Sequence, residues 1–424
     1  MFHDRYALPL TTNAAAARDH YVTACDRFLA AAPDPAGAFA AAIAVDDGFA
    51  LAHAGQARAY QMVGNMDASR AALARARACT GGVTPREAAQ VAAFGHLIEG
   101  RGAEGYQLIR AHLADYPRDA MICQTCMGVF SLIGFSGQPG RESEALAMAE
   151  MLAPHFGDDW WFLAQLGFAQ MESGRTGPAL PNMERSLDLN RDNANAAHYR
   201  AHLFYEVGET DAGLAFLSDW MTSYDRAGLM HCHNSWHVAL WSLATGDEAR
   251  MWAIVDADLL PEVSGSPSLN ILTDLASLYY RAEMAGVVVP AARWQALSTY
   301  AAQAFPEPGV AFADIHAALA HAMAGQGVAL DRIVTDATGP AADIVARCAQ
   351  AFGAIAAQDW PRALTALTDV MGDHARLGGS RAQRDLIEYA MATVLLRVGR
   401  PDEARRLLAM HRPLTDHAGA IRGL

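Results

Sequence analysis

The stretch that decides the fold is DWWFLAQLGFAQMESGRTGPALPNMERSLDLNRDN (159–193), together with the block that follows it, ANAAHYRAHLFYEVGETDAGLAFLSDWM (194–221). In both blocks apolar residues recur at three- and four-residue spacing, which predicts helices. One glycine interrupts each block, Gly174 and Gly208, and the two glycines lie 34 residues apart. That spacing is the period of the tetratricopeptide repeat, in which each helix pair buries its apolar face against its neighbours.

The same pattern of paired helices continues along the chain. Residues 49–78 read as a helix pair broken at Gly64, and TPRE (84–87) is a capping box that starts another pair. Further pairs fit 268–304, 308–335, 340–372 and 380–411. Nothing reads as an alternating strand, so we predict an all-α, tetratricopeptide-like right-handed solenoid of about ten or eleven helix pairs. We expect residues 1–424 to form one continuous array, although the pattern does not fix the repeat register of residues 1–155.

The composition narrows the classes of function. The chain has 424 residues, is 52% hydrophobic and carries a formal net charge of -14, so we expect a folded protein that binds neither nucleic acid nor a membrane surface. The sequence contains no lysine, which excludes a lysine Schiff base and the phosphate loop GxxxxGK. It shows no secretion signal and no apolar run that could span a membrane, so we expect a soluble, cytoplasmic protein without disulfides.

Five blocks of the C-terminal half are informative as a set. They are AHYRAHLFYEVGE (197–209), CHNSWHVALWSLATGDEARMWAIVDADLL (232–260), MAGVVVPAARWQAL (284–297), FADIHAALA (312–320) and GGSRAQRDLIEYA (378–390). Their order and spacing resemble the tetratricopeptide repeat protein 38 family, and residues 159–424 carry this resemblance. It implies an all-helical repeat array and no established activity. Family members carry an apolar-aspartate pair after a block ending in LLPEVSGSP; here SLNILTDLA (268–276) follows that block, and only Asp274 is carried over.

Two histidine pairs are the main candidates for a site. His198 and His202 form one HxxxH, and His233 and His237 form a second, 35 residues or about one repeat later. Residues four apart share a helix face, and both pairs fall on the first helix of a repeat, the helix that lines the concave groove. We therefore expect four imidazoles to project into one region of the groove, whereas His231 points elsewhere.

The chemistry of these histidines stays open. We favour a binding module that holds a peptide or a small anionic ligand in the groove. The alternative is an enzyme in which His202, His237 and Asp314 carry out acid–base hydrolysis or elimination, with or without a metal. A pure interaction scaffold is the third possibility, and it predicts exposed, mutually distant histidines. We predict no metal ligands, because a zinc site needs three or four donors in tetrahedral geometry and groove-facing histidines are expected to lie too far apart.

Besides His198 and His233, five residues are candidate ligand contacts. Asn234 either orients an imidazole or marks the start of its helix. His316, in FADIHAALA, either belongs to the site or braces helix packing. Arg381, Arg384 and Asp385 share one helix face. An arginine pair can grip a carboxylate or a phosphate, and the alternative is an internal Arg381–Asp385 ion pair.

The position of the C-terminal repeats relative to the histidines depends on how far the solenoid curls. If the solenoid curls enough, the C-terminal arginines meet the histidines across the groove.

CQTC (123–126) is a single CxxC, which indicates buried small residues on a helix rather than a metal or redox site. We expect a peptide or a small molecule as the partner. The cofactor is unknown, and a homo-oligomer stays open.

Overall fold

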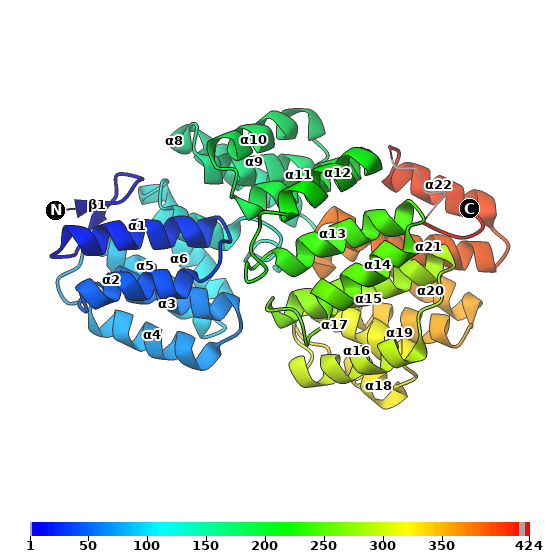
Figure 1. Cartoon of the computed structure of the whole chain (residues 1–424). Coiled ribbons are helices and arrows are strands. Elements are labelled where there is room, and N and C mark those ends of the chain that lie inside the picture. The colour runs from blue at the N-terminus through cyan, green and yellow to red at the C-terminus, as the bar shows by residue number, and fades with distance from the viewer. Residues whose placement is uncertain (1, 415–419) are drawn as a thin grey trace.

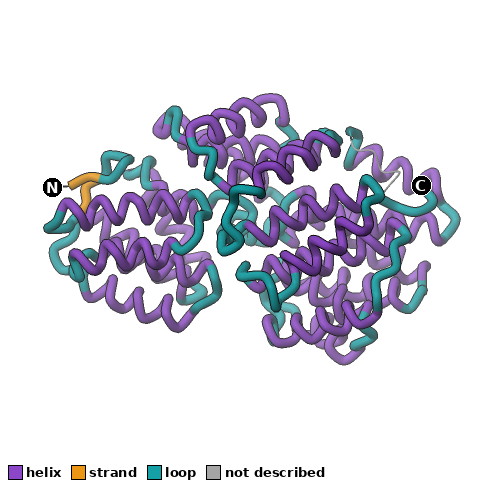
Figure 2. The backbone as a smooth tube through the Cα atoms, viewed as in Figure 1, coloured by secondary structure: helices purple, strands orange, loops and turns teal. Residues whose placement is uncertain are grey.

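The computed structural model of the chain describes residues 2–414 and 420–424. These residues form twenty-two α-helices and one short hairpin (Figure 1). Helices make up most of the described residues, and within these residues strand is seen only near the N-terminus (Figure 2). The predicted all-α solenoid of ten or eleven helix pairs is confirmed. The hairpin, in which β1 (Phe2–His3) pairs antiparallel with β2 (Pro9–Leu10), was not predicted, because two-residue strands are too short to show alternation.

The first six helices make three pairs around one core. They are α1 (Ala15–Leu29), α2 (Pro35–Val45), α3 (Ala50–Met62), α4 (Met66–Ala78), α5 (Pro85–Ile98) and α6 (Gly102–Asp115). The predicted capping box starts α5, because the Thr84 side chain accepts from the Glu87 backbone N–H and the Glu87 side chain accepts from the Thr84 backbone N–H. Apolar side chains between Tyr6 and Ala169 form the core of this part of the array.

The repeat pattern is interrupted once, before the middle of the chain. The elements here are α7 (Ala120–Cys123), the 3-10 turn η1 (Gln124–Cys126), α8 (Arg141–Phe156), α9 (Trp160–Glu172), α10 (Thr176–Leu189), α11 (Ala194–Glu206) and α12 (Thr210–Met221). The helix that should begin the fourth pair is reduced to α7 and η1, and the loop 127–140 follows it. Cys123 and Cys126 are free and buried, as expected for small packing residues.

The remaining helices build the larger C-terminal part of the array. They are α13 (His231–Ala244), α14 (Glu248–Ile254), the π-helical turn η2 (Val255–Leu259), α15 (Ser268–Ala285), α16 (Ala291–Ala304), α17 (Ala311–Met323), α18 (Gly327–Asp336), α19 (Ala342–Ala356), α20 (Trp360–Met371), the 3-10 turn η3 (His374–Leu377), α21 (Arg381–Arg397) and α22 (Pro401–His411). A second core, from Cys232 to Ile421, joins them. No helix of the described residues has the length and apolar character needed to cross a membrane.

The turn inside a helix pair depends on one residue in the left-handed conformation. Gly174 and Gly208, which set the 34-residue period, have φ of 76° and 75°. Glycine adopts this conformation without the steric cost that a Cβ atom brings. Between α19 and α20 the corresponding residue is Gln358, with φ of 57°, and between α1 and α2 it is Ala31, with φ of 54°. These two turns carry strain that a glycine would avoid.

The array curls until its last repeats touch its middle. Helix α21 contacts both α11 and α15. Arg141, at the start of α8, donates hydrogen bonds to the carbonyls of Ala375 and Gly379, just before α21. The loop 127–140 lies against α11, where a Cβ built on Gly128 would sit 3.0 Å from the Tyr199 hydroxyl. The concave side is therefore occupied by the protein's own chain next to α9 and α11.

Candidate functional site

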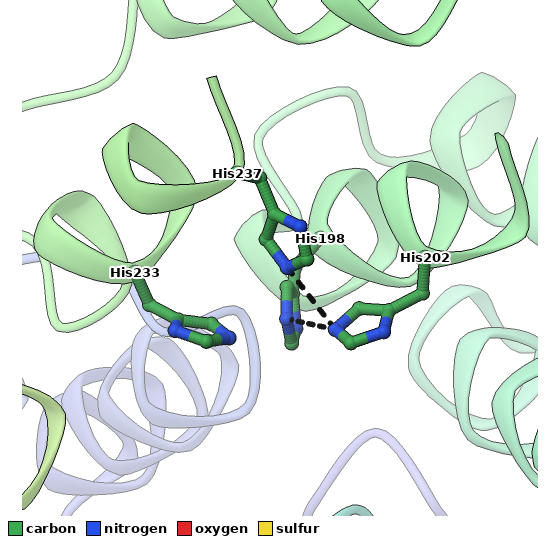
Figure 3. Close-up of side chains that lie close together, drawn as sticks. All are labelled: His198, His202, His233 and His237. Carbon is green, nitrogen blue, oxygen red and sulfur yellow. Dashed lines mark hydrogen bonds between the residues drawn. The ribbon is translucent and has the colours of Figure 1, made fainter. Parts of the chain in front are cut away.

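Four imidazoles from two successive repeats meet at one point (Figure 3). His198 and His202 come from α11, and His233 and His237 come from α13; together we call them the histidine cluster. One ligand nitrogen from each residue lies within 4.8 Å of all the others. The Nε2 atom of His202 lies 2.7 Å from that of His198 and 3.1 Å from that of His237. The wide separation that argued against a metal is therefore absent.

The histidine cluster is buried rather than open to a groove. Its side chains are between 0% and 5% exposed. The ring of Phe168 lies 5.8 Å from that of His202, and the Trp236 indole stacks on His233 at 5.1 Å. The expectation of a ligand groove lined by these histidines overlooked the loop 127–140 and α21, which occupy the concave side.

Asp274 on α15 fixes the orientation of one ring. The Nδ1 atom of His233 lies 2.8 Å and 3.0 Å from its two carboxylate oxygens. An ionised carboxylate only accepts hydrogen bonds, so Nδ1 carries the proton and the lone pair of Nε2 points into the cluster. The sequence indicates this contact through the distance of each residue from the turn glycine that follows it. Asp274 lies 12 residues before Gly286, and His233 lies 13 residues before Gly246. The two residues therefore occupy nearly the same position in successive repeats.

Burial controls the protonation of the cluster. It lowers the pKa of His198, His202 and His237 well below the usual value of an imidazole, and the neighbouring rings lower each pKa further. These three rings are therefore neutral near pH 7. Burial raises the pKa of Asp274, and the contact with His233 offsets part of that rise.

Asp314 and His316 do not join the cluster. Asp314 accepts a hydrogen bond of 3.0 Å from the Gly309 N–H, and the Nδ1 atom of His316 donates to the Phe312 carbonyl over 2.7 Å. Burial raises the pKa of Asp314 to about 6 and lowers the pKa of His316 to about 4. Both hydrogen bonds are local to the start of α17, so these two residues brace that helix.

The predicted arginine pair is already engaged by carboxylates. The Nε atom of Arg381 donates to Glu206 over 3.1 Å, and Arg384 donates to Glu142. The Arg381–Asp385 ion pair considered from the sequence does not form, because Arg381 reaches α11 instead. The last repeats do meet the middle ones, but these two arginines bind acidic side chains there rather than the histidines.

Asp385 lies in a buried ionic group that the sequence did not reveal. It pairs with Arg281 of α15, and the Nε atom of Arg412 lies 3.7 Å from its carboxylate. The Tyr205 hydroxyl donates to Asp385 over 2.5 Å. Arg281 is seven residues after Asp274 and so shares its helix face, which is a weak signal. Arg412 lies beyond the last helix, where helical periodicity does not indicate which residues a side chain contacts.

Asn234 is neither exposed nor a helix cap. It is fully buried within α13, and neither its amide nitrogen nor its amide oxygen has a hydrogen-bond partner among residues 2–414 and 420–424. The N-cap position of this helix is Met230. Asn234 thus adds uncompensated polar atoms on the same helix as His233 and His237. His231 lies apart and stacks on Tyr224 at 6.4 Å.

A cavity of about 560 Å³ lies one helical turn from the histidine cluster. Its lining includes Tyr205, three residues after His202, and Trp241, four residues after His237. The ring centroids of Trp241 and His237 are 6.1 Å apart. Arg281 also lines the cavity, and its charge helps to lower the pKa of His237. Cavity and cluster therefore share a wall.

No protein-family model matches the chain. Among solved structures, yeast Tom70 is similar at a TM-score of 0.34 and 12% identity, over 95% of this chain and 93% of that chain. The TPR domain of P58(IPK) is similar at a TM-score of 0.21 and 14% identity, over 93% of this chain and 99% of that chain. Likenesses this distant carry no argument about function. The chain is a tetratricopeptide-type array of helix pairs on the evidence of its own helices and turns.

Proposed function

We propose that this protein binds a small molecule inside its curled solenoid, in the cavity beside the histidine cluster. The shared wall of Tyr205, Trp241 and Arg281 is the observation that carries the proposal, because it links a group of buried titratable side chains to a cavity. A volume of about 560 Å³ is in the range of small-molecule sites. The occupied concave side favours such a ligand over an extended peptide.

The charges around the cavity favour an apolar ligand with an amino group over the small anion expected from the sequence. Among the described residues of the lining, Arg281 is the one that is basic, and Asp385 already pairs with it. Glu209 and Asp211 lie exposed on the same lining, and among the described residues neither forms an ion pair. An ammonium group is attracted to these carboxylates, and the ring of Trp241 attracts cations as well.

The enzyme and scaffold alternatives fit the histidine cluster to different degrees. The enzyme alternative gains support from the neutral, buried imidazoles of His202 and His237 so close to a cavity, because neutral imidazoles can accept protons from a bound substrate. The scaffold alternative expects exposed and distant histidines, and the observed cluster is buried and compact.

We also propose membership of the tetratricopeptide repeat protein 38 family, which the five ordered sequence blocks support.

A matched pair of ligands tests the sign of the charge. We expect phenethylamine to raise the melting temperature of the protein in a thermal-shift assay, and phenylacetate to have no effect. The double variant Glu209→Gln, Asp211→Asn should lose this stabilisation, since both side chains are exposed and their replacement leaves the core intact. Asp67→Asn, at an exposed site on α4, is the control. Equal stabilisation of the double variant, or stabilisation by phenylacetate alone, contradicts the proposal.

A further inference from the structure

In the histidine cluster, the nitrogen lone pairs that face one another outnumber the N–H protons available to form hydrogen bonds with them. A neutral imidazole carries one N–H, and the Nε2 atoms of His198, His202 and His237 face one another at 2.7 Å and 3.1 Å. A proton on the Nε2 of His202 satisfies one of these contacts and leaves the other poorly aligned. The Nε2 of His233 adds a further lone pair, because Asp274 holds the proton of that ring on Nδ1. Such an arrangement is repulsive unless a cation occupies its centre.

We propose that the histidine cluster binds one divalent transition-metal ion, with zinc as the ion that fits the donors best. This inference goes beyond small-molecule binding and does not rest on it. It replaces the expectation of no metal ligands, which depended on an assumed separation of the two histidine pairs.

The spacing of the donors is compatible with one ion. In a tetrahedral site with Zn–N bonds of 2.0–2.1 Å, ligand nitrogens lie about 3.3 Å apart. The two observed Nε2 separations, 2.7 Å and 3.1 Å, lie just below that value, and all four donor nitrogens lie within 4.8 Å of one another. Small rotations of rings that already point at one centre suffice to bind the ion.

The donor type restricts which ion binds. Four imidazole nitrogens suit zinc and its borderline-soft neighbours, whereas magnesium and calcium prefer oxygen. The thiol of Cys232, next to His233 in the chain, lies 3.9 Å from a carboxylate oxygen of Asp274 and is not part of the cluster. Because all four donors come from the protein, the site is closed, as structural zinc sites are. The ion therefore links α11 to α13.

Asp274 supports the proposal independently of the nitrogen spacing. Metal-bound histidines usually donate their second ring N–H to a carboxylate or a carbonyl, which sets the tautomer and the ring orientation. His233 and Asp274 form this contact inside the core, with Asp274 only 1% exposed. A carboxylate buried so deeply needs a partner, and an imidazole bound to a cation donates a stronger hydrogen bond to it than a free imidazole does.

Metal analysis of the full chain tests the inference without any organic ligand. Protein purified without a histidine tag is stripped with a chelator, reloaded with zinc, dialysed and analysed by mass spectrometry. We expect about one zinc per chain, a higher melting temperature than that of the stripped protein, and visible d–d absorption of a tetrahedral ion when cobalt replaces zinc. Absence of both bound zinc and the cobalt bands from the wild-type protein would overturn the proposal.

A variant locates the ion. His202→Asn combined with His237→Asn removes one donor from each helix, and we expect it to lose the zinc and the cobalt bands. His321→Asn changes a buried histidine that contacts Ser298 instead, and it should retain both. If the double variant fails to fold, the cobalt spectrum of the wild-type protein and the single variant His202→Asn decide the question. Zinc retained by the folded variants would contradict the assignment.

Discussion

The carboxylate of Asp274 determines which nitrogen of His233 faces the cluster. In Asp274→Asn the side chain keeps its shape but can present its NH₂ group to Nδ1, which favours the wrong tautomer. We predict that this variant binds zinc roughly 10- to 100-fold more weakly, measured by competition with a chromophoric chelator. Asp314→Asn is the control, because this buried aspartate contacts a backbone N–H away from the cluster. Unchanged zinc affinity in Asp274→Asn would show that the contact is only a packing feature.

Glu172 makes the stability of the protein depend on pH. Burial, and then the charges of Glu142 and Glu206, raise its pKa to about 8. The second oxygen of its carboxyl group has no hydrogen-bond partner in the described part of the chain. The folded state therefore keeps a proton that the unfolded state loses above its ordinary pKa near 4.5. The free energy of unfolding should fall as pH rises from about 4.5 to about 8.

We predict that Glu172→Gln removes this loss. Glutamine can still accept the hydrogen bond from the Arg381 N–H and has no charge to bury. At pH 9 the variant should be more stable than the wild type by on the order of 5 kcal/mol, and at pH 4 the two should be nearly equal. Urea denaturation at both pH values measures the difference. A difference that does not change with pH would show that Glu172 is not protonated in the folded state.

Residue spacing predicted which histidines meet but not their surroundings. The HxxxH spacing in two successive repeats places His198, His202, His233 and His237 on adjacent faces, and the structure brings them together. Their burial accompanies the contacts of α21 with α11 and of the loop 127–140 with Tyr199. These contacts join segments that are distant in sequence and follow no repeat rule. The repeat position of Asp274 matched that of His233, so this partner was within reach of the sequence.

At the scale of single elements, the turn between α19 and α20 is strained, as is the turn between α1 and α2 at Ala31. Gln358 adopts a left-handed φ of 57°, which costs a residue with a Cβ atom about 1 kcal/mol or more. We predict that Gln358→Gly stabilises the protein by up to about 1 kcal/mol, despite the greater flexibility of glycine in the unfolded chain. Urea denaturation is the measurement, and Gln358→Ala should bring no gain. Destabilisation by glycine would mean that side-chain contacts of Gln358 outweigh the strain.

Helix pairs were predictable because each one carries local signals. Apolar spacing, the turn glycines and the capping box at Thr84 give boundaries close to those of α3, α4, α5 and α9. The reduced helix α7 escaped prediction, because its residues remain apolar while the chain turns away into the loop 127–140. Local periodicity reports helix formation and does not report where a long-range contact replaces a helix.

At the scale of the whole molecule, Arg412 fastens the end of the chain to its middle. It pairs with Glu206 of α11 and approaches Asp385 and Glu388 of α21, all buried. We predict that Arg412→Gln lowers the free energy of unfolding by about 3–5 kcal/mol, because it leaves buried acidic side chains without their cation. Urea denaturation measures the loss.

The matched control for this prediction is Arg405→Gln. Arg405 forms an ion pair with Asp402 on the exposed face of α22, so its loss should cost less than about 1 kcal/mol. If both arginine variants lose the same small amount, the buried ionic group does not hold the two ends of the array together.

The curl of the array decides the site, and sequence patterns do not encode it directly. Each repeat contributes a small rotation, and the sum of these rotations brings α21 against α11 and α15. The Arg281–Asp385 pair and the neighbouring cavity result from this closure. The residues of the cluster were therefore predictable from their spacing, whereas the curl that turns the expected open groove into a buried centre was not.

X-ray absorption at the zinc edge of the tag-free, zinc-loaded protein is the most direct test of the metal centre. We predict a first shell of four nitrogens at about 2.0–2.1 Å, with the outer-shell scattering of imidazole rings. His202→Asn should reduce the nitrogen count or abolish binding. A shell that contains sulfur near about 2.3 Å or is built mainly from carboxylate oxygens, or a protein that retains no zinc, would contradict a metal centre in the histidine cluster.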